Sequence, residues 1–132
     1  FFLPLLTDSG GNAGSQASTL TVRALATGQI KLSDWSALIK RELLVSLALG
    51  ITVALGVAVL GIFRGGYEVA LIVSVSMALI ILGGSLIGML LPFVLSKFNR
   101  DPATASAPLV TSIVDIFGIA IYFAIAKVVL GL

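Results

Sequence analysis

The sequence predicts an all-α fold, a bundle of helices that cross the membrane several times. Of the 132 residues, 58% are apolar and only 11% are charged, whereas about 25% charged residues is typical of a soluble domain. Three stretches with at most one charge each are longer than the roughly 20 residues that a helix needs to cross the hydrocarbon core. We therefore expect a multi-pass protein of the cell membrane, in contact with the lipid bilayer.

The composition also excludes several classes of function. The chain has no cysteine and no histidine, which removes thiol nucleophiles, zinc sites of the Cys/His kind and histidine acid–base catalysis. Its basic residues are dispersed and never alternate with aromatic ones, so we expect no nucleic acid partner. We also expect no catalytic residues, and we do not class the chain as an enzyme.

The first expected helix, residues 1–22, differs from the others in its middle, TDSGGNAGSQAST, which is polar and rich in glycine. A lipid-facing helix would not tolerate this run. A helix beside a water-accessible path would, because polar structure at membrane depth persists only where protein or water covers it. Helical spacing places polar residues, and glycines that leave the backbone uncovered, on one face of this helix or at the edges of that face. These residues are Asp8, Gly11, Asn12, Gly14 and Gln16.

A polar connector, residues 23–42, follows the first helix. Residues 30–39 within it are amphipathic, and we expect a short interfacial helix there with Trp35 near the lipid headgroups. We treat this helix as separate from the span that comes after it.

Two apolar spans are expected at residues 43–63 and 69–96, separated by the short segment RGGYE. The second of them contains Gly84-Ser-Leu-Ile-Gly88, a GxxxG pattern. Such patterns allow close approach of two helices. We interpret it as a packing motif with no chemistry attached.

The last span is expected at residues 102–128, with Asp115 near its middle. A charge at that depth costs several kcal/mol unless it faces a cavity or a partner. Helical spacing gives Asp115 a face of small or polar residues, and Pro108 is expected to free the carbonyl of Thr104. That face comprises Thr104, Ala107, Pro108, Thr111, Gly118 and Tyr122. The competing interpretation is a structural or protonated Asp115 inside the bundle.

The basic residues predict the orientation. Six of the eight lie in the first and third connectors: Arg23, Lys31, Lys40, Arg41, Lys97 and Arg100. The positive-inside rule then places these connectors in the cytoplasm and the C-terminus outside. A chain that begins in the cytoplasm would need an odd number of further spans before residue 1, most simply one.

The candidate ligands in the apolar segments are all oxygen atoms, from carboxylates, amides, hydroxyls and backbone carbonyls. This set favours a hard cation, Mg²⁺ or Ca²⁺, and disfavours copper, zinc and anions. One chain offers few such ligands. A symmetric homodimer would double Asp115 around a central axis and is the simplest way to complete a pore.

Three segments resemble the MgtE-type magnesium transporters. The GGNAGSQ run at residues 10–16, together with ATGQI at residues 26–30, is similar to the family's second transmembrane helix. DPATASAPLVTSIVDIFGIAIYF at residues 101–123 is similar to its last helix, and Arg41-Glu42-Leu-Leu fits the start of its third. The resemblance runs from one end of the chain to the other.

The resemblance implies a homodimeric Mg²⁺ channel with five spans per subunit, four of them in this chain, and a pore at the dimer interface. Residues 1–132 would form its transmembrane ion-permeation domain, and cytoplasmic regulatory domains are expected in the full-length protein. Asp115 would be the pore carboxylate, with Glu42 at the cytoplasmic entrance. Further pore-lining groups would be Thr111, Gly11, Asn12 and Gly14. Apart from the resemblance, the polar character of the first helix makes Asp8 and Gln16 candidates for the pore or its entrance.

Several functions stay open at this point. The leading hypothesis is passive permeation of hydrated Mg²⁺ between the first and last helices. The alternative within transport is antiport of the cation against H⁺ or Na⁺, with Asp115 protonated in turn. From other classes, an intramembrane aspartyl protease would use Asp8 and Asp115, although the chain lacks a GxGD context. A purely structural membrane anchor is the remaining alternative.

Overall fold

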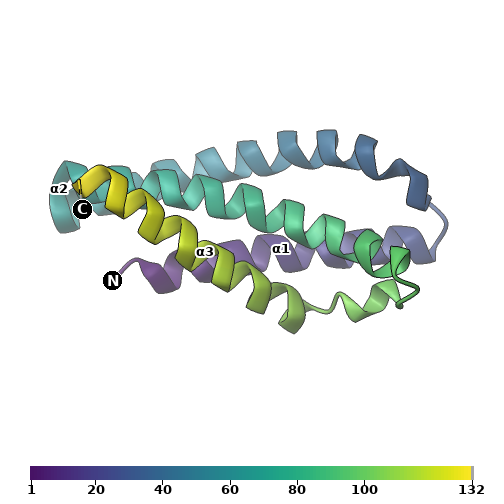
Figure 1. Ribbon diagram of the computed structural model, residues 1–132. Coiled ribbons are helices and arrows are strands. Elements are labelled where there is room, and N and C mark those ends of the chain that lie inside the picture. The colour runs from purple at the N-terminus through teal and green to yellow at the C-terminus, as the bar shows by residue number, and fades with distance from the viewer. Residues whose placement is uncertain (132) are drawn as a thin grey trace.

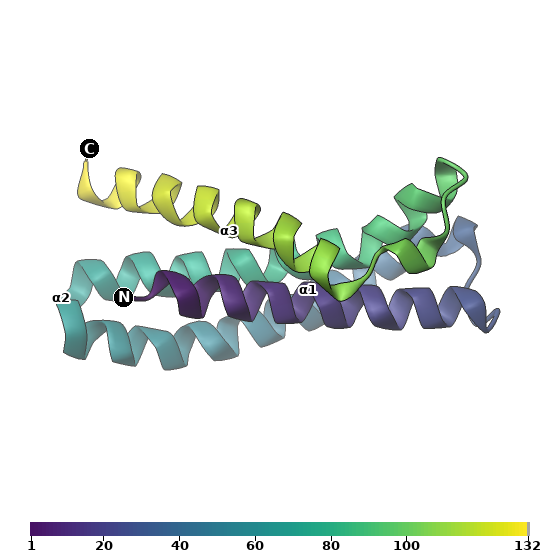
Figure 2. The same ribbon diagram turned by 90° about the horizontal axis from the view of Figure 1, so that it is seen from below.

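The computed structural model describes residues 1–131, which form a bundle built from helices alone (Figure 1). The elements in chain order are α1 (Leu3–Ala26), η1 (Leu32–Asp34), α2 (Trp35–Lys97), η2 (Pro102–Thr104) and α3 (Ala107–Leu130). The predicted all-α fold class is confirmed. Figure 2 shows α1 lying along α2, with α3 diverging from both toward the C-terminus.

α1 is a regular helix through the whole glycine-rich run. Pro4 lies in its first turn, where a missing N–H does not interrupt the helical ladder. The helix ends at Ala26, where the N–H of Thr27 bonds to the carbonyl of Arg23. Gly28 follows with φ +73°, a left-handed conformation that suits glycine. α1 therefore occupies the first expected helix and extends beyond it.

α2 is a helical hairpin. Gly66 has φ 78° and ψ −167°, a conformation that is essentially restricted to glycine. The chain reverses there, and we call residues 35–65 the first arm and residues 67–97 the second arm. Figure 1 shows the two arms side by side. The reversal lies within the RGGYE segment that separates the two expected apolar spans.

The expectation of a separate interfacial helix at residues 30–39 is wrong. Residues 32–34 form a single 3₁₀ turn, and Trp35 is the first residue of α2 itself. No glycine or proline stands between Trp35 and residue 43 to interrupt the helix. The helix therefore continues directly into the apolar first arm. Trp35 is 51% exposed.

α3 begins at Ala107, later than the expected start at residue 102. Asp101 accepts a hydrogen bond from the N–H of Ala103 and caps the short turn η2 instead. Pro108 lies in the first turn of α3, where it displaces no helical hydrogen bond. The carbonyl of Thr104 accepts the N–H of Ser106 at 2.7 Å. The prediction that Pro108 frees this carbonyl, and that Thr104 shares the helical face of Asp115, is therefore wrong.

Glycines allow α1 and the second arm to touch through their backbones. A Cβ placed on Gly84 would lie 2.7 Å from the carbonyl oxygen of Gly10, and one on Gly14 would lie 2.8 Å from the carbonyl oxygen of Gly84. A Cβ on Gly88 would overlap the carbonyl oxygen of Gly14. The interpretation of the GxxxG pattern as a packing motif is confirmed.

Two helical segments, Leu32–Lys97 and α3, are long and apolar enough to cross a membrane. Large apolar side chains lie exposed on both, among them Leu44, Phe63 and Ile116. The end of α1, the start of α2 and the end of the second arm lie together at one end of the bundle (Figures 1 and 2). These helix ends, together with the connectors that follow α1 and α2, carry six of the eight basic residues.

The glycine contact gives the first testable prediction. We expect Gly88→Leu to lower the thermal unfolding temperature of the detergent-solubilised protein, because overpacking of a close contact costs about 1–3 kcal/mol. The matched control is Gly56→Leu, since a Cβ at Gly56 meets nothing within 4 Å. Equal unfolding temperatures for the two variants would contradict this account of the contact.

Candidate functional site

Asp115 lies two turns inside α3 and its side chain is half-buried. Three other carboxylates accept hydrogen bonds from the chain: Asp8, Asp34 and Asp101. Among residues 1–131, Asp115 accepts none. Its carboxylate therefore has full capacity to accept hydrogen bonds from a ligand or from water. An apolar helix that carries such a group needs a polar neighbour or a water-filled path beside it.

Gly11 of α1 lies close to this carboxylate. A Cβ placed on Gly11 would lie 3.2 Å from Cγ2 of Thr111 and 3.7 Å from Oδ1 of Asp115. Gly11 itself is buried. The sequence predicted that the last helix would face the glycine-rich one, and the structure brings Gly11, Thr111 and Asp115 together. A larger side chain at Gly11 would press directly on the two polar residues.

Thr111 presents its oxygen as an acceptor. Its hydroxyl lies 3.0 Å from the carbonyl oxygens of Ala107 and Pro108, to which it donates. The lone pairs of the hydroxyl oxygen then remain for an incoming donor. Thr111 and Asp115 are one turn apart, so the two acceptors form a row along α3.

Asp8 and Asn12 lie on the exposed face of α1, next to Gly11 along the helix surface. The amide nitrogen of Asn12 donates to the carboxylate of Asp8 at 3.1 Å. This bond orients the amide oxygen of Asn12 as a further acceptor. The exposed stripe of α1 therefore adds two oxygen-bearing side chains to the rim of the site.

The structure places the other predicted residues elsewhere. Gly14 is buried at the crossing of α1 with the second arm, beneath Val110 and Val114. Gln16 and Glu42 line a groove of about 480 Å³ between α1 and α2. Arg41, Gln29, Ser46 and Ser85 also line this groove. The candidate residues thus lie in three places: a cluster around Asp115, a helix crossing and a groove. The ligand roles of Gly14, Gln16 and Glu42 stay predictions.

Residues that the sequence reasoning left out shape the site. Val110 and Val114 are fully buried, and they pack on the glycines of α1. Gly118 belongs to the same buried row, next to Ile80, rather than to the face of Asp115. The spacing of four residues between Val110, Val114 and Gly118 was the available signal. Asp115 therefore lies at the rim of the α1–α3 contact and not at its centre.

Ser18 was also missed. Its hydroxyl donates to the carbonyl of Ala105 at 2.7 Å, and both residues are buried. Ser18 follows Gly14 by one helical turn and Gly11 by two, which was the signal for its position on the same face.

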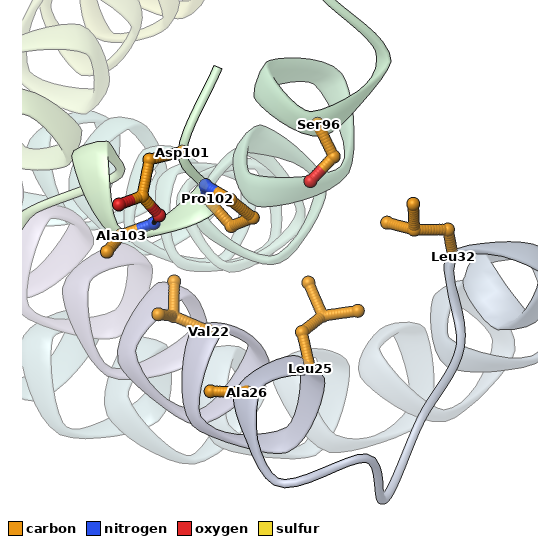
Figure 3. A pocket seen from close by; sticks show the side chains of 8 residues that line it. All are labelled: Val22, Leu25, Ala26, Leu32, Ser96, Asp101, Pro102 and Ala103. Carbon is orange, nitrogen blue, oxygen red and sulfur yellow. Dashed lines mark hydrogen bonds between the residues drawn. The ribbon is translucent and has the colours of Figure 1, made fainter. Parts of the chain in front are cut away.

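A second cavity lies at the basic end of the bundle (Figure 3). It has a volume of about 330 Å³, and its lining is mostly apolar, including Val22, Leu25 and Leu32. Its one carboxylate, Asp101, is engaged with the N–H of Ala103. In residues 1–131 no three acidic, histidine or cysteine side chains converge. Within these residues, the side-chain oxygens of the candidate site are those of Asp115 and Thr111, with Asp8 and Asn12 at its rim.

Comparison with known proteins gives a consistent family. A family model described as a divalent cation transporter matches residues 3–125. The magnesium transporter MgtE of Thermus thermophilus is 39% identical over 98% of the chain, and that of Enterococcus faecalis is 34% identical over 96%. The chain spans 29% and 28% of the length of these relatives. With nearly every described residue covered by the match, the chain belongs to the MgtE family of divalent cation transporters.

Proposed function

We propose that this chain is the permeation domain of a magnesium transporter, in which Mg²⁺ moves along a path lined by α1 and α3. The observation that carries the proposal is the meeting of Gly11 with Thr111 and the half-buried Asp115. The relatives bear the name magnesium transporter, which supports Mg²⁺ as the ion.

The chemistry of the site suits a cation that keeps its water. Mg²⁺ dehydrates reluctantly, and its bound waters are hydrogen-bond donors. Asp115 and Thr111 both carry oxygen atoms that accept hydrogen bonds, and both side chains lie beside Gly11. In the low-dielectric interior, the charge of the ion also offsets the desolvation of the carboxylate. We therefore assign Asp115 to the water shell of the ion rather than to direct coordination.

A second copy of the chain completes this path. Asp115 lies at a rim beside the exposed face of α3, so one chain encloses only part of an ion. A two-fold axis next to this face would bring two carboxylates to one pore. In this arrangement α1, the two arms of α2 and α3 are four of five spans, and the C-terminus is outside. The full-length protein would add the remaining span and the cytoplasmic regulatory domains.

Glu42 and Gln16 belong at the cytoplasmic entrance in this proposal. They line the groove between α1 and α2, and Glu42 lies in the third turn of α2. The start of α2 lies at the basic end of the bundle (Figure 1). A carboxylate at that place lowers the local electrostatic repulsion of a cation by the surrounding basic residues.

Removing the charge of Asp115 tests the site. We expect Asp115→Asn to lower Mg²⁺ uptake into liposomes by about tenfold or more, because hydrogen bonds to a charged acceptor exceed those to a neutral one by roughly 1–2 kcal/mol. The control is Glu68→Gln, which removes an exposed carboxylate from the Gly66 turn. Uptake by Asp115→Asn at the level of the parent would favour the structural-anchor alternative.

The driving force separates passive permeation from antiport. We expect Mg²⁺ uptake to follow the membrane potential and to be unchanged when a pH or Na⁺ gradient is imposed at constant potential. The measurement is fluorescence of a Mg²⁺ indicator inside liposomes. A rate that scales with either imposed gradient would instead support exchange of the cation for H⁺ or Na⁺.

Cross-linking tests the dimer. In a background without other cysteines, we expect Ser112→Cys to form a covalent dimer with a short bifunctional thiol reagent in liposomes, since Ser112 lies on the exposed face of α3 beside Asp115. Val59→Cys, on the exposed side of the first arm, is the control and is expected to remain monomeric. Equal yields from the two positions would contradict the proposed interface.

A further inference from the structure

One hydrogen bond of the described chain differs from all its other side-chain hydrogen bonds. The bond from the Ser18 hydroxyl to the Ala105 carbonyl joins residues 87 positions apart in the sequence. In residues 1–131, each of the other side-chain hydrogen bonds connects residues at most four positions apart, as those of Thr21 and Ser46 illustrate. Within residues 1–131, this bond is therefore the one side-chain hydrogen bond between segments distant in the sequence.

The acceptor is a carbonyl that the local structure leaves unpaired. Ala105 follows the turn η2, and its own N–H bonds back to Pro102. The helical ladder of α3 starts one residue later, where the carbonyl of Ser106 accepts the N–H of Val110. A buried carbonyl without a donor is costly. Ala105 is 4% exposed and Ser18 is 0% exposed, so water does not reach this carbonyl. The Ser18 hydroxyl supplies the hydrogen-bond donor instead.

The bond and the ion site lie on the same contact surface. Ser18 follows Gly11 by seven residues, which is about two turns of α1 and nearly the same face. On the partner segment, Ala105 directly precedes the helix that carries Thr111 and Asp115. The contacts between the two ends of this surface are apolar ones, made by Val110 and Val114 on glycines. Such contacts are non-directional and do not by themselves fix the position of one helix along the other.

We propose that Ser18 is a positioning residue for transport: its bond to Ala105 fixes the start of α3 on α1 and thereby sets where Asp115 stands relative to Gly11. The inference rests on the proposed function of Asp115. Ser18 does not touch the ion and acts through the placement of α3. Loss of the bond allows α3 to slide along α1, which changes the width of the gap that Asp115 and Gly11 border.

The functional test compares two fully buried serines. Ser18→Ala removes the bond, and Ser76→Ala removes a hydroxyl that is also 0% exposed and has no hydrogen-bond partner in residues 1–131. With uptake normalised to folded protein, we expect Ser18→Ala to lower the Mg²⁺ rate by about tenfold, the size of effect that one buried hydrogen bond has on an equilibrium. The preference for Mg²⁺ over Ca²⁺ is expected to fall as well, and Ser76→Ala is expected to match the parent in both.

A distance measurement tests the position of α3 without transport. Spin labels on cysteines introduced at Leu20 of α1 and Ile116 of α3, both exposed, report the separation of the two helices in liposomes by pulsed electron resonance. We expect a broader or shifted distance distribution in Ser18→Ala and the parent distribution in Ser76→Ala.

The outcomes distinguish the two proposals. A changed distance together with reduced uptake and reduced selectivity supports the positioning role of Ser18. An unchanged distance overturns it, as does a changed distance with parental uptake and selectivity. If the parent protein shows no Mg²⁺ uptake, the proposed function is contradicted, and so is the role of Ser18 in transport. The label distances would then still test, separately, whether Ser18 holds α3 in place.

Discussion

The architecture depends on the close contact of α1 with the second arm of α2, made by glycine backbones. Gly10 and Gly14 meet Gly84 and Gly88 so closely that a methyl group on Gly88 would overlap the backbone of α1. Inside a bilayer, helices gain little from the hydrophobic effect on associating, so van der Waals packing between small residues is a principal source of stability. The absence of side chains at these glycines also lets α3 approach α1, because it leaves room for Val110 and Val114.

This packing explains how a carboxylate is tolerated in an apolar helix. The valines of α3 take the buried centre of the contact, and Asp115 is left at its rim, where the exposed face of α1 begins. At the rim, Gly11 contributes no side chain, so α1 and α3 approach closely there without a Cβ pressing on Thr111 and Asp115. The polar residues of α1 then follow the same edge. The packing contact and the proposed permeation path thus use adjacent faces of one helix.

The directional contact of Ser18 complements the non-directional glycine packing. Apolar surfaces specify which helices meet, while a buried hydrogen bond specifies their relative position along the axis. For a site formed between two helices, that relative position decides the distance between the groups that the two helices contribute. The groove lined by Glu42 is separate from this contact, so the entrance and the narrow part of the proposed path are held by different interactions.

The sequence alone determined what local composition and periodicity encode. It predicted the helical fold, the apolar spans, the packing role of the GxxxG pattern and the isolated charge of Asp115, because each depends on residues close together in the chain. The tertiary structure decided which faces meet. It assigned Gly14 to a crossing and Gly11 to the site, although both lie in one glycine-rich run. It also set the start of α3 and paired Ser18 with Ala105, since capping by Asp101 and a contact across 87 residues have no counterpart in helical periodicity.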